Sequence, residues 1–304
     1  MRSWIFLFLC NLMWALQFTC VKLVQDQVGP LFTVWGPMTL ATLLLIPLIR
    51  AESGSSGIRL KRRSDALLFL VLAAIGVFPG QVIVTWGTRM TTASNAAIIM
   101  LALPVCTAVL AFFFLRERMT AIRWVSFGIA IAGVLLCSES DLRGMHFQTT
   151  YLAGNALVAF GMLGSSFYNS YGKKVLERYA PMEMLFYTYV GMFVILTPFV
   201  LVEEGGVFSR VPSFTASTWL GLILLTALHN YLSMVLFLKA LHKLDAIQAA
   251  LSNYLITFFG IPVAAIVLGE RMSSAAIIGG ILVLASTLLI SIRGAAQGNV
   301  CEPS

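Results

Sequence analysis

The sequence is short of charged residues. Only 11% of its 304 residues are charged, 59% are hydrophobic, and the mean hydropathy is +0.90. Soluble domains carry about 25% charged residues, and a chain of this length folded in water would leave too much apolar surface exposed. The composition therefore excludes a soluble domain and predicts an integral membrane protein.

Motifs of enzyme chemistry are also missing. The sequence contains no HExxH or GxSxG motif and no cofactor-binding fingerprint, and its five cysteines have no metal-like spacing. We therefore expect no enzyme activity, no cofactor and no bound metal. The net charge of +7 is spread over short loops without a stripe of stacking aromatics, so we expect no nucleic acid partner.

Long apolar runs recur along the chain, and a membrane-spanning helix needs about 20 mostly apolar residues. The first run is too long for a signal peptide and has no cleavage site after it, so we expect it to be retained. The fold class predicted is an all-α integral membrane protein with ten transmembrane helices, at about 4–24, 31–49, 66–88, 93–115, 121–138, 151–173, 182–202, 217–241, 246–268 and 274–292.

The distribution of Lys and Arg predicts the orientation. With the N-terminus inside, 15 of the 20 basic residues fall on the inner side and 5 on the outer side. This bias agrees with the positive-inside rule. We expect a multi-pass protein of the cell membrane, the bacterial inner membrane favoured, with both termini cytoplasmic.

The two halves of the sequence resemble each other. Residues 93–138 match 246–291 at a shift of 153, with about a dozen identities, and the charged triplet Glu117-Arg118-Met119 recurs as Glu270-Arg271-Met272. A repeat of five helices, an odd number, must insert its second copy upside down, as in many secondary transporters. We predict a first five-helix repeat in 1–145, an inverted second repeat in 146–293, and a cytoplasmic tail in 294–304.

These features resemble a known family. Trp14-Ala15-Leu16-Gln17-Phe18 with Lys22 in the first run, and Leu-x-Glu-Arg-Met closing the fourth and ninth runs, look like the drug/metabolite transporter superfamily in its ten-helix EamA-type branch. The resemblance covers about 4–292. It implies a central cavity lined mainly by helices 1, 3, 4, 6, 8 and 9, and transport of amino acids and related metabolites, with aromatic amino-acid exporters as the first relatives to consider.

Acidic residues are absent from the middle of all ten runs. An intramembrane carboxylate is costly and marks function where it occurs, so a carboxylate-driven cation antiporter is disfavoured. Glu117 and Glu270 lie at run ends, where we expect each to pair with its neighbouring Arg or with another helix terminus.

Polar and aromatic side chains at helical spacing predict a neutral, aromatic cavity. Gln17 and Gln81 must face water or protein, because a glutamine in hydrocarbon is costly; they line a cavity or join helices. Asn95 is a helix N-cap or a substrate contact. The candidate substrate-binding residues are Trp14, Gln17, Gln81, Thr85, Asn95, Tyr168, His229 and Asn253.

His229 is the titratable side chain that we place deepest in a run. A histidine changes charge near neutral pH, so His229 could couple transport to protons or bind a substrate carboxylate. The alternative is a neutral histidine that forms a hydrogen bond between helices.

The combined interpretation is a secondary transporter, an exporter or facilitator of small polar or amphipathic metabolites by alternating access. Amino acids are favoured as substrates, and the transporter is expected as a monomer or loose dimer in the lipid bilayer. The alternatives are a multidrug or toxic-compound efflux carrier and, more distantly, a channel or a membrane-embedded enzyme. Saturable flux at low turnover separates a carrier from a channel.

The charge distribution makes a topology prediction. Reporters fused after Arg293 or inserted within 50–65 should be cytoplasmic, and a reporter within 203–216 should be external. Alkaline phosphatase and fluorescent-protein fusions measure this. A C-terminus found outside would contradict the five-plus-five arrangement.

Overall fold

The structure is a computed structural model, and it describes residues 2–53, 60–91, 96, 99–100, 102–117, 120–137, 149–256, 258–259, 277–279, 281–286 and 288–289. Every regular element within these ranges is a helix. The predicted all-helical class is therefore confirmed for the described part of the chain.

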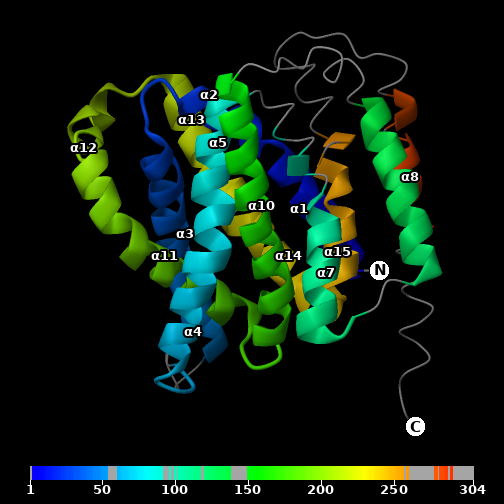
Figure 1. Ribbon diagram of the computed structural model, residues 1–304. Coiled ribbons are helices and arrows are strands. Elements are labelled where there is room, and N and C mark those ends of the chain that lie inside the picture. Colours follow the sequence, from blue (N-terminus) through cyan, green and yellow to red (C-terminus); the bar gives the residue numbers. More distant parts are fainter. Residues whose placement is uncertain are drawn as a thin grey trace.

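The helices of the N-terminal part are α1 (Arg2–Ala15), α2 (Gln17–Val24), α3 (Pro30–Ser53), α4 (Asp65–Val71), η2 (Leu72–Ile83), α5 (Val84–Met90), α7 (Leu103–Leu115) and α8 (Ala121–Cys137). Those of the C-terminal part are α10 (Thr149–Val175), α11 (Pro181–Glu203), α12 (Val207–Arg210), η3 (Val211–Ser213), α13 (Ala216–Leu224), η4 (Leu225–Leu232), α14 (Ser233–Lys243) and α15 (Ala246–Ser252). In Figure 1 the long helices run side by side as a bundle, with α8 at one edge.

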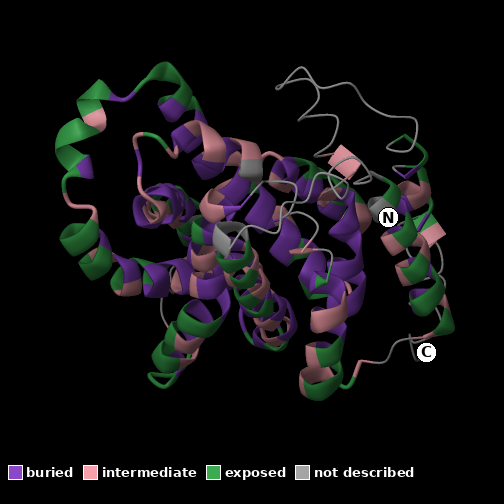
Figure 2. Cartoon of the chain, turned by 45° about the horizontal axis from the view of Figure 1, so that its top comes forward, coloured by how far each residue is buried: buried purple, intermediate pink, exposed green. Residues whose placement is uncertain are grey.

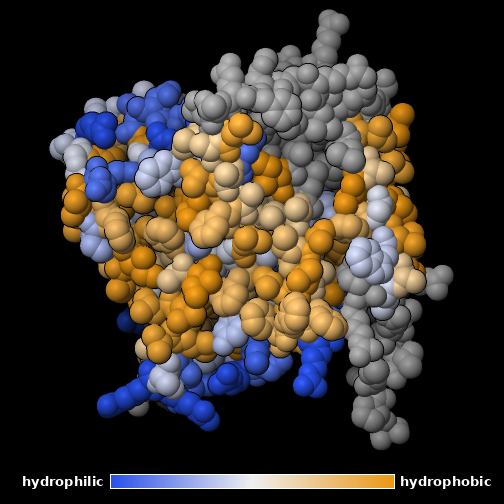
Figure 3. Space-filling model, in the orientation of Figure 1, coloured by the Kyte–Doolittle hydropathy of each residue, from blue (hydrophilic) through white to orange (hydrophobic). Residues whose placement is uncertain are grey.

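Five helical stretches of the described chain are long and apolar enough to cross a membrane: Arg2–Val24, Pro30–Arg50, Asp65–Met90, Pro181–Glu203 and Ala216–Lys243. They coincide with five of the predicted spans. α10 is also long enough but is less apolar than these five. Hydrophobic side chains cover the surface of the bundle at mid-height, and hydrophilic side chains gather toward its ends (Figure 3). Buried residues concentrate on the inward faces of the helices (Figure 2). This arrangement is the one expected of a protein whose solvent at mid-height is lipid.

The predicted span 4–24 is not one continuous helix. It divides at Leu16 into α1 and α2, and the Leu16 backbone N–H donates to the Met13 carbonyl only three residues back, at 3.3 Å. A bond over three residues is a tighter turn than the α-helical bond over four. The chain therefore turns more tightly at Leu16 than in the helices on either side.

The centre of the bundle depends on small residues that let backbones approach. α10 makes its most extensive contacts with η2, α5 and α7. A Cβ built on Gly161 of α10 would lie 2.6 Å from the Pro79 carbonyl oxygen, and one on Gly164 would lie 2.9 Å from the Gly76 carbonyl oxygen. Close helix packing through small residues is the usual way to join helices in lipid, where no hydrophobic force drives helices together.

Two glutamates at helix ends tie distant helices together. The Glu117 carboxylate, just beyond α7, accepts from the backbone N–H groups of Ala246 and Ile247 at the start of α15, at 2.9 and 3.1 Å. This confirms for Glu117 the predicted pairing with another helix terminus; Glu270 lies outside the described residues. Burial raises the pKa of the Glu117 carboxyl, and the two backbone donors oppose that rise.

Glu204 makes the same kind of contact at the end of α11. Its carboxylate accepts from the backbone N–H groups of Leu31 and Phe32 in the first turn of α3, at 3.0 and 2.8 Å. A carboxylate at a helix N-terminus satisfies N–H groups that have no partner within the helix, and it complements the helix dipole.

The close packing of α10 on η2 leads to a stability prediction. Gly161→Ala should lower the melting temperature of the purified protein, because its Cβ meets backbone that cannot move aside; overpacking of this kind costs about 1–3 kcal/mol. Gly128→Ala on α8 is the matched control, since no heavy atom lies within 4 Å of its added Cβ. Thermal unfolding in detergent measures both. Equal melting temperatures in the two variants would contradict this account of the interface.

Candidate functional site: a central cavity

A cavity of about 110 Å³ lies between the helices. That space is several times what one buried water needs. Both parts of the chain line the cavity. The N-terminal part contributes α1, α2, α3, η2, α5 and α7, and the C-terminal part contributes α10, α11, η4 and α14. Its polar wall includes Gln17, Gln81, Ser165, Asn169, Asn230 and Asn253. Its aromatic wall includes Trp14, Tyr168, Tyr189, Phe237 and Tyr254.

Irregular backbone lies at the cavity wall. The division at Leu16 falls between Trp14 and Gln17, and a further break at Asn253 ends α15. The other two irregular segments are the π-helices η2 and η4. Non-helical or distorted backbone at membrane depth is tolerated where it lines a cavity or is buried in protein, and broken helices of this kind form transporter binding sites.

Pro79 lies inside η2. A proline has no N–H to donate and its ring displaces the carbonyl of the preceding turn, so it disturbs the regular α-helical bonds there. At the end of η2 the Val84 backbone N–H donates to the carbonyls of Gln81, three residues back, and Pro79, five residues back, and a bond over five residues is that of a π-helix. The sequence predicts a kink from Gly76, Pro79 and Gly80, and the structure accommodates these residues in a π-helix of 12 residues.

Side chains stabilise the distortion of η4. The Asn230 amide donates to the Leu225 carbonyl at 2.8 Å, the Ser233 hydroxyl donates to the His229 carbonyl, and the Tyr189 hydroxyl of α11 donates to the Asn230 carbonyl at 2.7 Å. Polar side chains that compete for backbone partners in this way bend or widen a helix. These bonds fix the part of the chain that carries His229 and Asn230 to the cavity.

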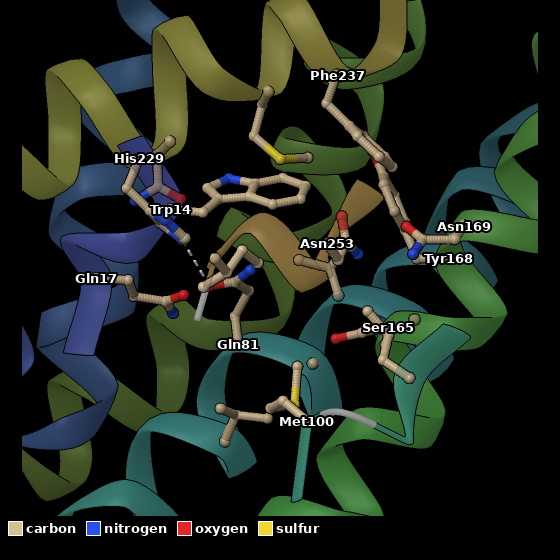
Figure 4. A pocket seen from close by; sticks show the side chains of 18 of the residues that line it. Trp14, Gln17, Gln81, Met100, Ser165, Tyr168, Asn169, His229, Phe237 and Asn253 are labelled. Atoms are coloured by element: carbon tan, nitrogen blue, oxygen red, sulfur yellow. Dashed lines mark hydrogen bonds between the residues drawn. The ribbon is translucent and has the colours of Figure 1, made fainter. Parts of the chain in front are cut away.

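A hydrogen bond joins the two π-helices across the cavity. His229 Nε2 lies 3.3 Å from Gln81 Oε1, and the His229 side chain is only 5% exposed. This geometry agrees with the predicted alternative of a histidine that forms a hydrogen bond between helices; a proton-coupling role remains a prediction. Trp14 lies beside the pair, with its ring centroid 6.5 Å from that of His229 and 5.0 Å from that of Phe237 (Figure 4).

Four buried polar atoms in residues that line the cavity have no hydrogen-bond partner in the structure. They are Trp14 Nε1, Tyr168 Oη, His229 Nδ1 and Asn253 Oδ1. A buried polar group without a partner costs about 1–3 kcal/mol, so such groups are uncommon outside sites with a function. All four belong to residues around one cavity, and the atoms themselves are buried beneath its surface.

Six of the eight predicted site residues meet at this cavity: Trp14, Gln17, Gln81, Tyr168, His229 and Asn253. Thr85 does not line it, although it is buried at 2% exposure. The lining face of this helix comprises Gly76, Val77, Gly80, Gln81 and Val84, so it ends one residue before Thr85. Asn95 lies outside the described residues.

Sequence reasoning missed several lining residues. Phe237 lies eight residues after His229, so helical spacing from that histidine could have found it. Tyr189 gives no such signal, because it reaches the wall only through the packing of α11 on its neighbours.

The wall is also free of strong charge. Among the described residues that line the cavity there is no Asp, Glu, Lys or Arg. Within the described residues no group of three or more His, Cys, Asp or Glu side chains could hold a metal ion. The arrangement can therefore offer hydrogen bonds and aromatic faces to a small molecule.

The fold and the site together define a helical multi-pass membrane protein built around a central polar and aromatic cavity. The EamA-like transporter family matches residues 1–138 and 152–292, and this protein belongs to that family.

Curated relatives resemble nearly the whole chain. A probable terminal-alkyne amino-acid exporter of Streptantibioticus cattleyicolor is 28% identical over 281 residues, which cover 92% of this chain and 90% of that protein. An uncharacterized transporter of Archaeoglobus fulgidus is 25% identical over 95% of this chain and 99% of its own length. An S-adenosylmethionine uptake transporter of Rickettsia bellii is 24% identical over 72% of this chain and 71% of its own.

A crystal structure of another protein shares the fold. It superposes with a TM-score of 0.76 at 15% sequence identity, covering 97% of this chain and 98% of that one.

The hydrogen bonds of η4 lead to a prediction about its dynamics. Tyr189→Phe removes only the hydroxyl that holds the Asn230 carbonyl, so amide hydrogen exchange should become faster in 225–232 while the fold stays intact. Tyr187→Phe in the same helix is the control, because the Tyr187 hydroxyl has no hydrogen-bond partner in the structure. Exchange in η4 that is unchanged by Tyr189→Phe would show that the hydroxyl does not hold this segment.

Proposed function

We propose that this protein is a secondary transporter of small polar or amphipathic metabolites, with amino acids foremost, and that it works by alternating access. The observation that carries the proposal is the central cavity, which helices from both parts of the chain line where their backbone is irregular. Discontinuous helices around a central site are the arrangement in which transporters bind their substrates.

Ten transmembrane helices in two inverted repeats form the scaffold of this proposal. The family matches the chain in two successive segments, 1–138 and 152–292. The π-helices begin at Leu72 and Leu225, 153 residues apart, which is also the separation of Glu117 and Glu270. Equal spacing of a backbone distortion and of a charged motif supports a duplication. The charge distribution then supports cytoplasmic termini in a bacterial inner membrane.

The choice of amino acids rests on two supports. The relative from Streptantibioticus cattleyicolor is named as a probable amino-acid exporter. The wall of the cavity combines amide groups with aromatic rings, which suits a molecule with polar and apolar parts. Multidrug efflux would use the same aromatic faces without needing the amides.

Reconstituted protein tests the proposal. Purified protein in liposomes loaded with unlabelled L-phenylalanine, L-leucine and L-methionine should take up the labelled amino acids by counterflow, and the flux should saturate. Ohmic current without saturation would instead make the protein a channel. Transport of amphipathic drugs with no amino-acid flux would favour the efflux alternative.

Trp14→Ala should weaken transport without preventing membrane insertion. The indole packs against Phe237 and beside His229, so its loss removes an aromatic face from the cavity wall. Loss of a contact worth about 1.4 kcal/mol weakens affinity tenfold, and we expect a rise of about that size in the half-saturation concentration of counterflow. Trp86→Ala is the control, because Trp86 is 49% exposed and does not line the cavity. Equal kinetics in the two variants, at equal expression, would count against this cavity as the site.

A further inference from the structure

Exposed basic side chains gather at one end of the bundle, outside the cavity. They come from two segments far apart in the sequence: the loop before α4, and the last turn of α10 with the turn that follows it. We call this group the basic patch, and its members, all exposed, are Lys61, Arg62, Arg63, Lys174 and Arg178. Hydrophilic side chains project from this end of the molecule below its hydrophobic surface (Figure 3).

Tertiary contacts hold the two segments of the basic patch together. The Lys61 backbone N–H donates to the Tyr179 hydroxyl at 3.0 Å, and the Lys61 ammonium donates to the Arg178 carbonyl. The same ammonium lies 5.0 Å from the centre of the Tyr179 ring. The Tyr179 hydroxyl in turn donates to the Asp65 carboxylate at 2.5 Å. The loop before α4 is thereby fixed against the turn between α10 and α11.

The charges of the basic patch are largely uncompensated. Asp65 is buried beneath it, and the Glu183 carboxylate accepts from the Ala180 backbone N–H at 3.0 Å. Glu177 is an exposed acidic residue among the five basic ones. Within the described residues, the charged groups of the four members other than Lys61 form no ion pair and no hydrogen bond. The patch therefore offers several free cationic donors to an anion.

Exposed apolar side chains begin directly beside these cations. Leu67 and Leu70 of α4 follow the basic loop and are 65% and 38% exposed, and Ile75 of η2 lies further along at 52%. In a bilayer such a surface faces acyl chains. A phospholipid joins a phosphate and acyl chains in one molecule, so a single lipid can contact the cations and the apolar surface together. A free phosphate ion can contact only the cations.

We infer that the basic patch binds the headgroup of an anionic phospholipid, whose acyl chains lie along Leu67, Leu70 and Ile75. Clusters of basic residues at the end of membrane helices attract anionic lipids, and the planar guanidinium of arginine matches the oxygens of a phosphate. Phosphatidylcholine is a poorer ligand, because its own ammonium cancels the charge of its phosphate. The site lies away from the cavity, and the inference does not depend on the proposed transport function.

Lipid retention tests the inference. Protein purified in detergent and mixed with equal amounts of phosphatidylglycerol and phosphatidylcholine should retain at least fivefold more phosphatidylglycerol in native mass spectrometry. Phosphatidylglycerol should also raise the melting temperature, since a ligand of the folded state stabilises it. Glycerol 3-phosphate at the same concentration should not. Equal retention of the two lipids would contradict recognition of charge, and equal stabilisation by glycerol 3-phosphate would make this a phosphate site instead of a lipid site.

Two triple variants assign the retention to the basic patch. Replacing Arg62, Arg63 and Arg178 with Gln removes three exposed charges but keeps the Lys61 contacts, and it should reduce the preference for phosphatidylglycerol to within twofold. The matched control removes three exposed basic residues outside the patch, by replacing Arg116, Lys239 and Lys243 with Gln.

The control variant should keep the preference of the parent protein. Parent-like retention in the patch variant would overturn the assignment to this patch. Equal loss in both variants would also overturn it, because overall charge would then govern the retention. Melting temperatures without added lipid should be the same in all three proteins, because every substituted side chain is exposed.

Discussion

The constraint on which this structure depends is that lipid offers the backbone no hydrogen bonds. A helix can be distorted at membrane depth only where other protein groups take over the lost partners. In η4 the side chains of Asn230, Ser233 and Tyr189 do so, each at a different carbonyl. Distorted helices are therefore tolerated only inside the bundle. They coincide with the cavity because polar side chains are available there.

Hydrogen bonding differs between the ends of the helices, where the polar groups named here have partners, and the centre of the bundle, where some do not. At the helix ends, Glu117 and Glu204 each accept from two backbone N–H groups of another helix. At the centre, Trp14 and Asn253 keep polar atoms without partners, and a single hydrogen bond from His229 to Gln81 joins the two π-helices. A binding site that is to take up and release a small molecule needs such a balance, since groups already fully satisfied within the protein gain little from a ligand.

Sequence patterns predicted the spans more reliably than the faces of the helices. Apolar runs alone located the five described stretches that are long and apolar enough to cross a membrane. The cost of a polar residue in hydrocarbon identified Gln17, Gln81 and His229 as residues of the interior. A spacing of four residues from Gln81 predicts Thr85 on the cavity wall, but the lining face of the packed helix ends at Val84. The division at Leu16 and the position of Tyr189 on the wall had no signal in the sequence pattern.

Composition and periodicity are properties of the chain, so they suffice for the lipid environment, the helical class and the neutral character of the interior. Periodicity describes only residues within one or two helical turns of each other. The cavity is made by residues far apart in the sequence, such as Gln81 and His229, which are 148 positions apart. Which polar side chain faces which other depends on how η2, η4 and α11 pack and on the extra residue that each π turn inserts. The family match assigns the chain to transporters, but the wall that a substrate would meet exists only once these helices are packed.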